Sequence, residues 1–396
     1  MPSDTSYWIV SVPMQEEKST EQMFHELDTH LQRANACDVG AAAPFPIPEL
    51  KTGTLDSMIT LSEDTSKTDA NFVAVTTRIV DTLRALVNDD EAALSEHLML
   101  DGASVDKYLL HWRWDAGRYR PDRPLPELVE LLSREMQSID TMMKQKLNAY
   151  NVAKGQLQQL ERKKNGNLSV RSLADVVQRD DIVDPNSDFL RTLLVVVPRN
   201  NVHEWRSEYE RLAPMVVPRS SQELAHDEEF ALFTVTVFKK TTSEFMQKAR
   251  EHKFQVRDFE WDEGALERER AELHEAGASE KELWTELVRL SRTNFADAFQ
   301  ALVHLKAIRT FVEAVLQFGL PARYFSAAIR PDARRAKNLV TTLLAQYGYL
   351  DEYISKSERE RKHAPPLQET PGEYVNLLEQ EVFPFVLTEV PKPQAQ

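Results

Sequence analysis

The feature that most constrains this chain is a stretch from Glu127 to Lys164 that contains no proline and a single glycine. Apolar side chains recur in it at intervals of three or four residues, the spacing of one face of an α-helix. They are Leu128, Leu132, Met136, Ile139, Met143, Leu147 and Tyr150. One uninterrupted helix of this length would span roughly 57 Å. Asn165-Gly166-Asn167 predicts its end.

A second long helical region is expected from about Asp262 to Phe318, before the stop signal Gly319-Leu320-Pro321. Its first half is mostly charged. Its second half is apolar on more than one side, which is typical of a helix buried among other elements. Gly277-Ala278 predicts a break, and the capping-box pattern from Ser279 to Glu282 predicts that the helix restarts there.

The segment between these two regions follows a different pattern. Short runs rich in β-branched and aromatic residues alternate with amphipathic stretches. The order strand, helix, strand, helix, strand predicts a compact α/β or α+β domain. The expected ranges are 192–198, 201–212, 230–238, 243–252 and 254–259.

Both ends of the chain also carry elements. A buried strand is expected at 7–13 and a helix at 56–87. Near the C-terminus we expect a polar, proline-marked loop at 355–371, then a short helix, then a strand at 383–387.

The distribution of apolar residues predicts how these parts are arranged. The two long helices are apolar where they are far from the central segment and polar where they adjoin it. If the polar ends lie side by side, the central segment is a separate domain on a two-helix neck. We therefore expect an α+β, predominantly helical, elongated head–neck–foot molecule, with an α/β-type head between two antiparallel neck helices. The divisions are 1–150 and 283–396 for the foot, 151–166 and 261–282 for the neck, and 167–260 for the head.

Composition excludes several classes of protein. The formal net charge is −15, which argues against nucleic-acid binding and against a protein that lies on anionic lipid. Only 11 glycines are present, against roughly 28 at average usage, so phosphate-cradling loops are disfavoured. The longest apolar run, Leu193 to Val197, is far shorter than a membrane span. The N-terminus resembles no signal peptide, so we expect a cytoplasmic protein without direct membrane insertion.

No catalytic, cofactor or metal-binding constellation is evident, and we expect the chain not to be an enzyme. His25 and His30 are five residues apart, whereas a zinc-binding helix needs its two histidines four apart. Cys37 stands alone without a positioned base. Acidic pairs such as Asp180-Asp181 and the run 227–229 are interpreted as solvated turns.

The remaining candidates are charged or aromatic clusters. Arg162, Lys163, Lys164 and Arg171 could grip an acidic partner, or the first three could simply stabilise the end of their helix. A second basic cluster is better explained as ordinary surface charge, and a group of aromatic residues as core packing rather than a binding face. The basic cluster is Arg330, Arg334, Arg335 and Lys337, and the aromatic group is Trp112, Trp114 and Tyr119.

One run is far more specific. Glu161-Arg-Lys-Lys-Asn-Gly-Asn-Leu-Ser-Val-Arg-Ser-Leu173 closely resembles the signature of the C subunit of the vacuolar-type proton-pumping ATPase (V-ATPase). Other segments are similar to the same family, in the same order along nearly the whole chain. They are Trp8 to Pro13, Phe45 to Asp56, Ala249 to Phe259 and His304 to Arg309 continuing to Phe318-Gly-Leu-Pro321. Departures fall mainly in 88–107 and 355–372.

The resemblance implies a function. Members of this family are non-catalytic stator subunits of the cytosolic V1 sector, with a globular head, a helical neck and a foot made from both chain ends. The head holds one peripheral stalk, an E–G heterodimer. The foot meets a second E–G stalk and the N-terminal domain of the pump's a subunit. The resemblance also implies release from the pump during reversible disassembly, and a position on the cytosolic face of vacuolar or endosomal membranes.

An alternative interpretation is a coiled-coil adaptor or scaffold outside the pump. It would explain the long helices, although not the β-rich insert. Such an adaptor would be a dimer, whereas the stator interpretation predicts a free monomer. No cofactor is expected in either case.

Overall fold

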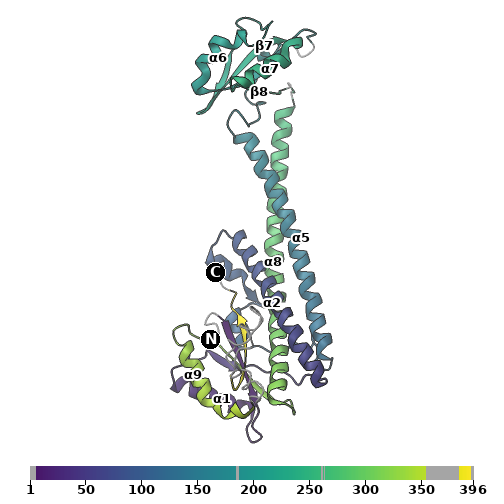
Figure 1. Ribbon diagram of the computed structural model, residues 1–396, viewed down its shortest axis with the longest axis vertical. Coiled ribbons are helices and arrows are strands. Elements are labelled where there is room, and N and C mark those ends of the chain that lie inside the picture. The colour runs from purple at the N-terminus through teal and green to yellow at the C-terminus, as the bar shows by residue number, and fades with distance from the viewer. Residues whose placement is uncertain (1–5, 184–186, 260–261, 263, 354–382, 394–396) are drawn as a thin grey trace, which may run out of the picture. The chain divides into compact units, whose positions relative to one another are not determined.

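The computed structural model describes residues 6–183, 187–259, 262, 264–353 and 383–393 (Figure 1). The chain divides into two compact units. Unit 1 comprises residues 1–145 and 287–396, and unit 2 comprises residues 146–286. The two long helices α5 (Leu125–Asn165) and α8 (Ala265–Phe318) each contribute one stretch to either unit.

Unit 1 is built on a four-stranded antiparallel sheet of order β10-β1-β9-β2. The first and last strands of the described residues are neighbours in it, with Ser6 opposite Pro391. The strands are β1 (Ser6–Pro13), β2 (Ala42–Pro44), β9 (Tyr324–Ile329) and β10 (Val386–Pro391). Nearly every residue of β1 is buried, because both faces of the sheet are covered.

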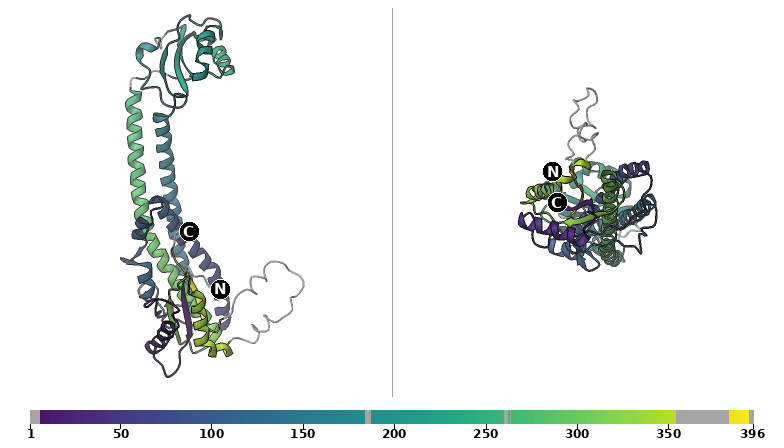
Figure 2. Two further views of the ribbon diagram at one scale, coloured as in Figure 1. Left: turned by 90° about the vertical axis from the view of Figure 1, so that its left-hand side faces the viewer. Right: turned by 90° about the horizontal axis from the view of Figure 1, so that it is seen from below.

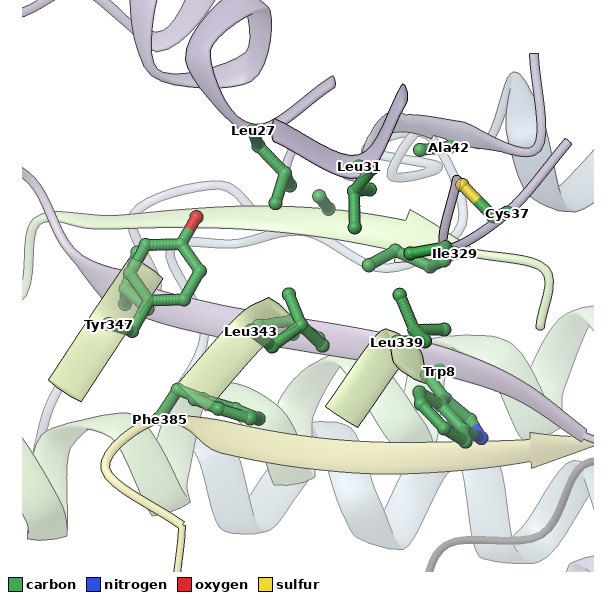
Figure 3. Packing of buried hydrophobic residues seen from close by; sticks show 14 of the residues in the cluster. Trp8, Leu27, Leu31, Cys37, Ala42, Ile329, Leu339, Leu343, Tyr347 and Phe385 are labelled. Atoms are coloured by element: carbon green, nitrogen blue, oxygen red, sulfur yellow. The ribbon is translucent and has the colours of Figure 1, made fainter. Parts of the chain in front are cut away.

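Helices α1 (Thr20–Arg33) and α9 (Ala336–Tyr347) cover one face of this sheet. Figure 3 shows Trp8 and Ile329 of the sheet facing Leu31 and Leu339 of these helices. α8 lies at the other face, where the hydroxyl of Thr310 donates to that of Thr388 in β10. The N- and C-terminal segments therefore share one core.

The rest of unit 1 is mostly helical. Besides the stretches of α5 and α8, its described residues include α2 (Leu55–Leu86), α3 (Glu91–His97), α4 (Val105–Leu110), the η5 turn (Gly348–Tyr353) and a short hairpin of β3 (Met99–Leu100) and β4 (Ala103–Ser104). The expected helix at 56–87 and the expected strand at 7–13 are confirmed within one residue. β10 begins at Val386 rather than at residue 383, because Pro384 has no N–H for a sheet ladder. The expected loop at 355–371 and the short helix after it lie outside the described residues.

Unit 2 contains a second antiparallel sheet, of order β6-β7-β5-β8. Its strands are β5 (Leu190–Pro198), β6 (Glu223–His226), β7 (Phe230–Phe238) and β8 (Gln255–Arg257), and its main helices are α6 (Val202–Glu208) and α7 (Thr242–Glu251). Single helical turns lie at η1 (Arg179–Asp181), η2 (Arg199–Asn201), η3 (Tyr209–Arg211) and η4 (Lys239–Thr241). All paired strands of this sheet are antiparallel.

This topology corrects one expectation. The α/β interpretation of the central segment is wrong, and the α+β interpretation holds. α6 connects β5 to β6, and α7 connects β7 to β8, so each helix joins two strands that have a third strand between them. The result is the ferredoxin-like βαββαβ arrangement. The strand β6, which the sequence pattern did not reveal, reverses the chain so that β7 runs antiparallel to β5.

The helix break expected at Gly277-Ala278 is also wrong, since α8 runs without interruption from Ala265 to Phe318. A side chain at position 277 would meet only a methyl group of Leu157 at 3.9 Å, so neither crowding nor backbone strain favours a break. Strong helix formers on both sides outweigh the modest cost of one glycine. The ends of both long helices agree with the sequence prediction, at Asn165 and at Phe318.

Candidate interaction surface

The family-like run 161–173 begins in the last turn of α5 and continues as a loop. Arg162, Lys163 and Lys164 are exposed there, where cations complement the partial negative charge of a helix C-terminus. The N–H of Gly166 donates to the carbonyl of Arg162 at 2.9 Å. A Cβ at Gly166 would lie 2.5 Å from that same oxygen, so glycine is required for the chain to leave the helix here.

The loop after the helix covers the second face of the unit 2 sheet. Leu168, Leu173 and Val177 are buried there, against Leu194 and Val196 of β5. α6 and α7 cover the opposite face (Figure 1). The run 161–173 therefore attaches the end of α5 to the sheet.

Two charged side chains hold this loop. The carboxylate of Asp227 accepts hydrogen bonds from the backbone N–H groups of Leu168, Glu229 and Phe230 at 2.7, 2.9 and 2.6 Å. Burial by itself would raise the pKa of Asp227, but these three donors lower it below its ordinary value. On the other side, the guanidinium of Arg257 donates to the carbonyls of Leu168 at 3.1 Å and Arg171 at 2.9 Å.

The four basic residues predicted to bind a partner do not have equal surroundings. Arg162, Lys163 and Lys164 form an exposed group, which we call the α5 basic end. Arg171 is half-buried and forms an ion pair with Asp175 at 3.5 Å. Partner binding by these residues stays a prediction.

Within unit 2, the adjoining stretches of α5 and α8 contact each other (Figures 1 and 2). Lys146 forms an ion pair with Glu286 at 2.7 Å. The hydroxyl of Tyr150 is hydrogen-bonded to Glu280, and burial together with this carboxylate raises the pKa of Tyr150. These contacts pair the two helices through polar side chains.

The aromatic group Trp112, Trp114 and Tyr119 packs in the core of unit 1, as the sequence analysis predicted. These rings surround His304 of α8, with centroid distances of 5.4, 5.0 and 4.7 Å. His304 Nε2 accepts from the N–H of Asp115, and its Nδ1 faces the carbonyl of Gln300. Burial lowers the pKa of His304 to about 4, so the imidazole is neutral at pH 7.

Two members of the second basic cluster form ion pairs, whereas Arg334 and Lys337 are exposed, as expected for surface charge. Arg330 pairs with Asp106 at 2.9 Å, and Arg335 pairs with Asp38 and Asp332. Cys37, the lone thiol, is buried, and burial raises its pKa. A raised pKa disfavours the reactive thiolate.

A buried ionic group in unit 1 was missed by the sequence analysis. One oxygen of Asp69 in α2 accepts from both Lys306 and Arg309 of α8 at 2.8 Å. The side chains of Lys306 and Asp69 are only 7% and 9% exposed. The segment 304–309 was singled out by family resemblance, but its partner 237 residues away gave no local signal.

Comparison with known proteins places these features in a family. The chain matches the model of the V-ATPase C-subunit family over residues 7–386. The V-type proton ATPase C subunit 1-A of Danio rerio is 37% identical over 382 residues, covering 96% of this chain and 97% of that protein. The V-type proton ATPase C subunits 1 of Rattus norvegicus and of Bos taurus are each 36% identical over the same shares.

The chain therefore belongs to the V-ATPase C-subunit family, and the resemblance carried by the run 161–173 is confirmed. As such it is an accessory subunit of a proton-transporting ATPase. Among the described helices, none combines the length and apolar content that a membrane span requires.

The chain also aligns with a solved structure. It is the cytoplasmic N-terminal domain of the V-ATPase I subunit, a homolog of the a subunit, and the alignment covers 86% of this chain and 97% of that chain. The identity is 14% and the TM-score is 0.30.

Proposed function

We propose that this chain is a non-catalytic stator subunit of the V1 sector, which cross-braces the peripheral stalks against the torque of rotary ATP hydrolysis. In this proposal residues 167–260 form a head that binds one E–G heterodimer. Residues 1–150 and 283–396 form a foot that binds a second E–G heterodimer and the N-terminal domain of the a subunit. Residues 151–166 and 261–282 form the neck. The chain is a monomer when free, and a peripheral component on the cytosolic face of vacuolar or endosomal membranes when assembled.

One observation carries the proposal most directly: the pairing of α5 with α8 inside unit 2. Contacts recur between these helices at Lys146–Glu286 and Tyr150–Glu280. The loop that follows α5 contacts α8 as well, since Ser172 donates to Glu269 at 2.8 Å. Two helices joined at several points resist bending better than one, as a brace under torque requires.

The proposed set of partner interfaces, one on the head and two on the foot, suits reversible assembly. Several moderate interfaces on one body give high avidity, because each bound interface raises the effective concentration of the others. Loosening one interface removes much of that gain, so control of assembly needs no single very tight contact. This supports a role in reversible joining of the cytosolic and membrane sectors.

The α5 basic end is the proposed contact for an acidic surface of a stalk. Reversing its charges with Arg162→Glu, Lys163→Glu and Lys164→Glu is expected to weaken binding of the full chain to purified E–G at least tenfold in titration calorimetry. The physical reason is that three attractive charges become repulsive ones. Because salt screens exposed charges, the unmodified chain should also bind E–G more weakly at higher salt.

A charge-matched control uses the exposed neck residues Lys154, Arg270 and Lys281, which lie outside the proposed head and foot, each changed to Glu. This control variant should bind E–G with close to the original affinity. Equal affinity of both triple variants, with circular dichroism showing that both are folded, would remove the α5 basic end from the proposed interface.

A further inference from the structure

Three metal-ligating side chains meet where α6 approaches the end of α7. Glu204 and Glu208 are four residues apart on α6 and so share one face of that helix. His252 follows directly after α7, at its C-cap. Each offers one ligand atom, and these three atoms lie within 4.8 Å of one another. In the described part of the chain, this is the group in which three such side chains come together.

Two of the three separations are close to those of a coordination shell. His252 Nδ1 lies 3.0 Å from a carboxylate oxygen of Glu204 and 3.6 Å from one of Glu208. Ligand atoms bound tetrahedrally at about 2.1 Å from a zinc ion are about 3.4 Å from one another. A cation could therefore enter between these atoms with little movement of the side chains.

Aromatic packing surrounds the backbone that carries these three side chains. The ring of His252 stacks on Phe254, with centroids 5.8 Å apart and planes 13° apart. Phe254 is buried and makes an edge contact with Trp205, which lies next to Glu204 in α6. Tyr209, the residue after Glu208, stacks on the same Trp205 ring, so the backbone at all three positions adjoins one aromatic cluster, which favours a preformed site.

The site is open to solvent on one side. The side chains of Glu204, Glu208 and His252 are 42%, 45% and 37% exposed. An ion can enter, and a water molecule can take a fourth coordination position. One imidazole nitrogen with two carboxylate oxygens suits zinc, whereas magnesium and calcium prefer ligand sets made entirely of oxygen.

We propose that Glu204, Glu208 and His252 bind one zinc ion, with water as the fourth ligand. The ion would clamp α6 to the end of α7 on one face of the unit 2 sheet. An ion pair between a protonated His252 and the two carboxylates would have a similar geometry, so the experiment must separate these two cases.

The test uses the full chain, treated with EDTA and dialysed, then titrated with zinc chloride in a calorimeter. We expect one saturable site per chain with a micromolar dissociation constant. His252→Ala and the milder Glu208→Gln should each weaken binding at least tenfold. Both positions are partly exposed, and circular dichroism of the metal-free variants establishes that they are folded.

A matched control is available in the same unit. His226 lies 3.3 Å from Glu223 but has no second carboxylate partner among the described residues. His226→Ala should leave zinc binding unchanged. Zinc should also raise the melting temperature of the original chain and of His226→Ala, but not that of His252→Ala.

Two results would overturn the proposal. Absence of saturable zinc binding by the original chain would leave the three residues as an ion pair only. Equal loss of binding in His226→Ala and His252→Ala would mean that zinc binds surface histidines without a dedicated site.

Discussion

At the scale of single residues, the most informative positions are polar groups inside cores. His304 is one of them, since it is enclosed by the rings of Trp112, Trp114 and Tyr119. The sequence identified all four residues, either in the aromatic group or in the family-like segment 304–309. It could not predict their meeting, because residues 112–119 and 304 are brought together only by the tertiary fold.

Stability should depend on pH through His304. Burial lowers its pKa from 6.5 to about 4, so the unfolded chain binds more protons than the folded chain between those values. The contribution of neutral His304 is complete above pH 6.5 and is lost progressively as pH falls toward 4. At low pH the free energy of unfolding is thereby reduced by about 3 kcal/mol.

This dependence can be measured by urea unfolding of the full chain at pH 7, 5.5 and 4.5. Hydrogen exchange of peptides around residue 304 then reports the unfolding of unit 1. His304→Gln should be less stable at pH 7 but should lose less stability on acidification. His25→Gln, at an exposed position of α1, serves as a control and should follow the original chain. An identical slope for His304→Gln and the original chain would refute this assignment.

The buried group of Asp69, Lys306 and Arg309 gives a second prediction. Asp69→Ala leaves Lys306 charged and buried without its partner, which should cost about 3–5 kcal/mol of unfolding free energy. Arg309 is affected less, because it also pairs with Glu313 at 2.7 Å.

The double variant Asp69→Leu with Lys306→Met removes both charges and should recover most of that loss. Denaturant unfolding of the single and double variants measures the difference. A double variant as unstable as Asp69→Ala would show that the cost comes from lost packing rather than from an unpaired buried charge.

At the scale of elements, sequence periodicity located the long helices well but not the short strands. The ends of α5 and α8 were predicted because Gly166 and Gly319 follow them. β6 is four residues long and only partly buried, so it has neither the length nor the apolar alternation of a recognisable strand. The capping box of Ser19 and Gln22 marks the start of α1 and would have revealed that helix.

The candidate site was predictable to a similar extent. The α5 basic end was found because it closes a stretch of helical periodicity and is followed by Asn165-Gly166, a helix stop signal. Asp227 and Arg257, which hold the loop at 166–173, gave no signal, since acidic residues are common in this chain and Arg257 lies some 86 residues from its carbonyl acceptor in Arg171. Glu204 and Glu208 have metal-ligand spacing, but His252 joins them only through the packing of two helices.

Two glycines should respond in opposite ways to the same substitution. Gly277→Ala is expected to stabilise unit 2 by about 0.5–1 kcal/mol, because α8 is continuous there and alanine is the better helix former. Gly166→Ala should destabilise it by about 1–3 kcal/mol, because the new Cβ would meet the carbonyl oxygen of Arg162. Thermal unfolding of both variants measures the shifts. Destabilisation by Gly277→Ala would indicate that the helix is broken at that position after all.

At the scale of the whole molecule, family membership and the mechanical proposal have different support. The match over residues 7–386 makes the chain a V-ATPase accessory subunit. The bracing role rests on the pairing of α5 with α8 and has a mechanical consequence. A helix-breaking proline in either partner, Gln158→Pro in α5 or Glu269→Pro in α8, removes a backbone hydrogen bond and bends the helix.

The most direct measurement of the bracing role is ATP-driven proton transport by pump membranes depleted of their own C subunit and then supplied with this chain. The original chain and the controls Gln158→Ala and Glu269→Ala should restore transport and reassembly of the two sectors, because alanine keeps each helix straight and Glu269→Ala loses only the hydrogen bond from Ser172. The proline variants should fail to restore either, while circular dichroism and cooperative unfolding show that units 1 and 2 remain folded. Full transport with the proline variants would contradict the account, since a bent brace would then serve as well as a straight one.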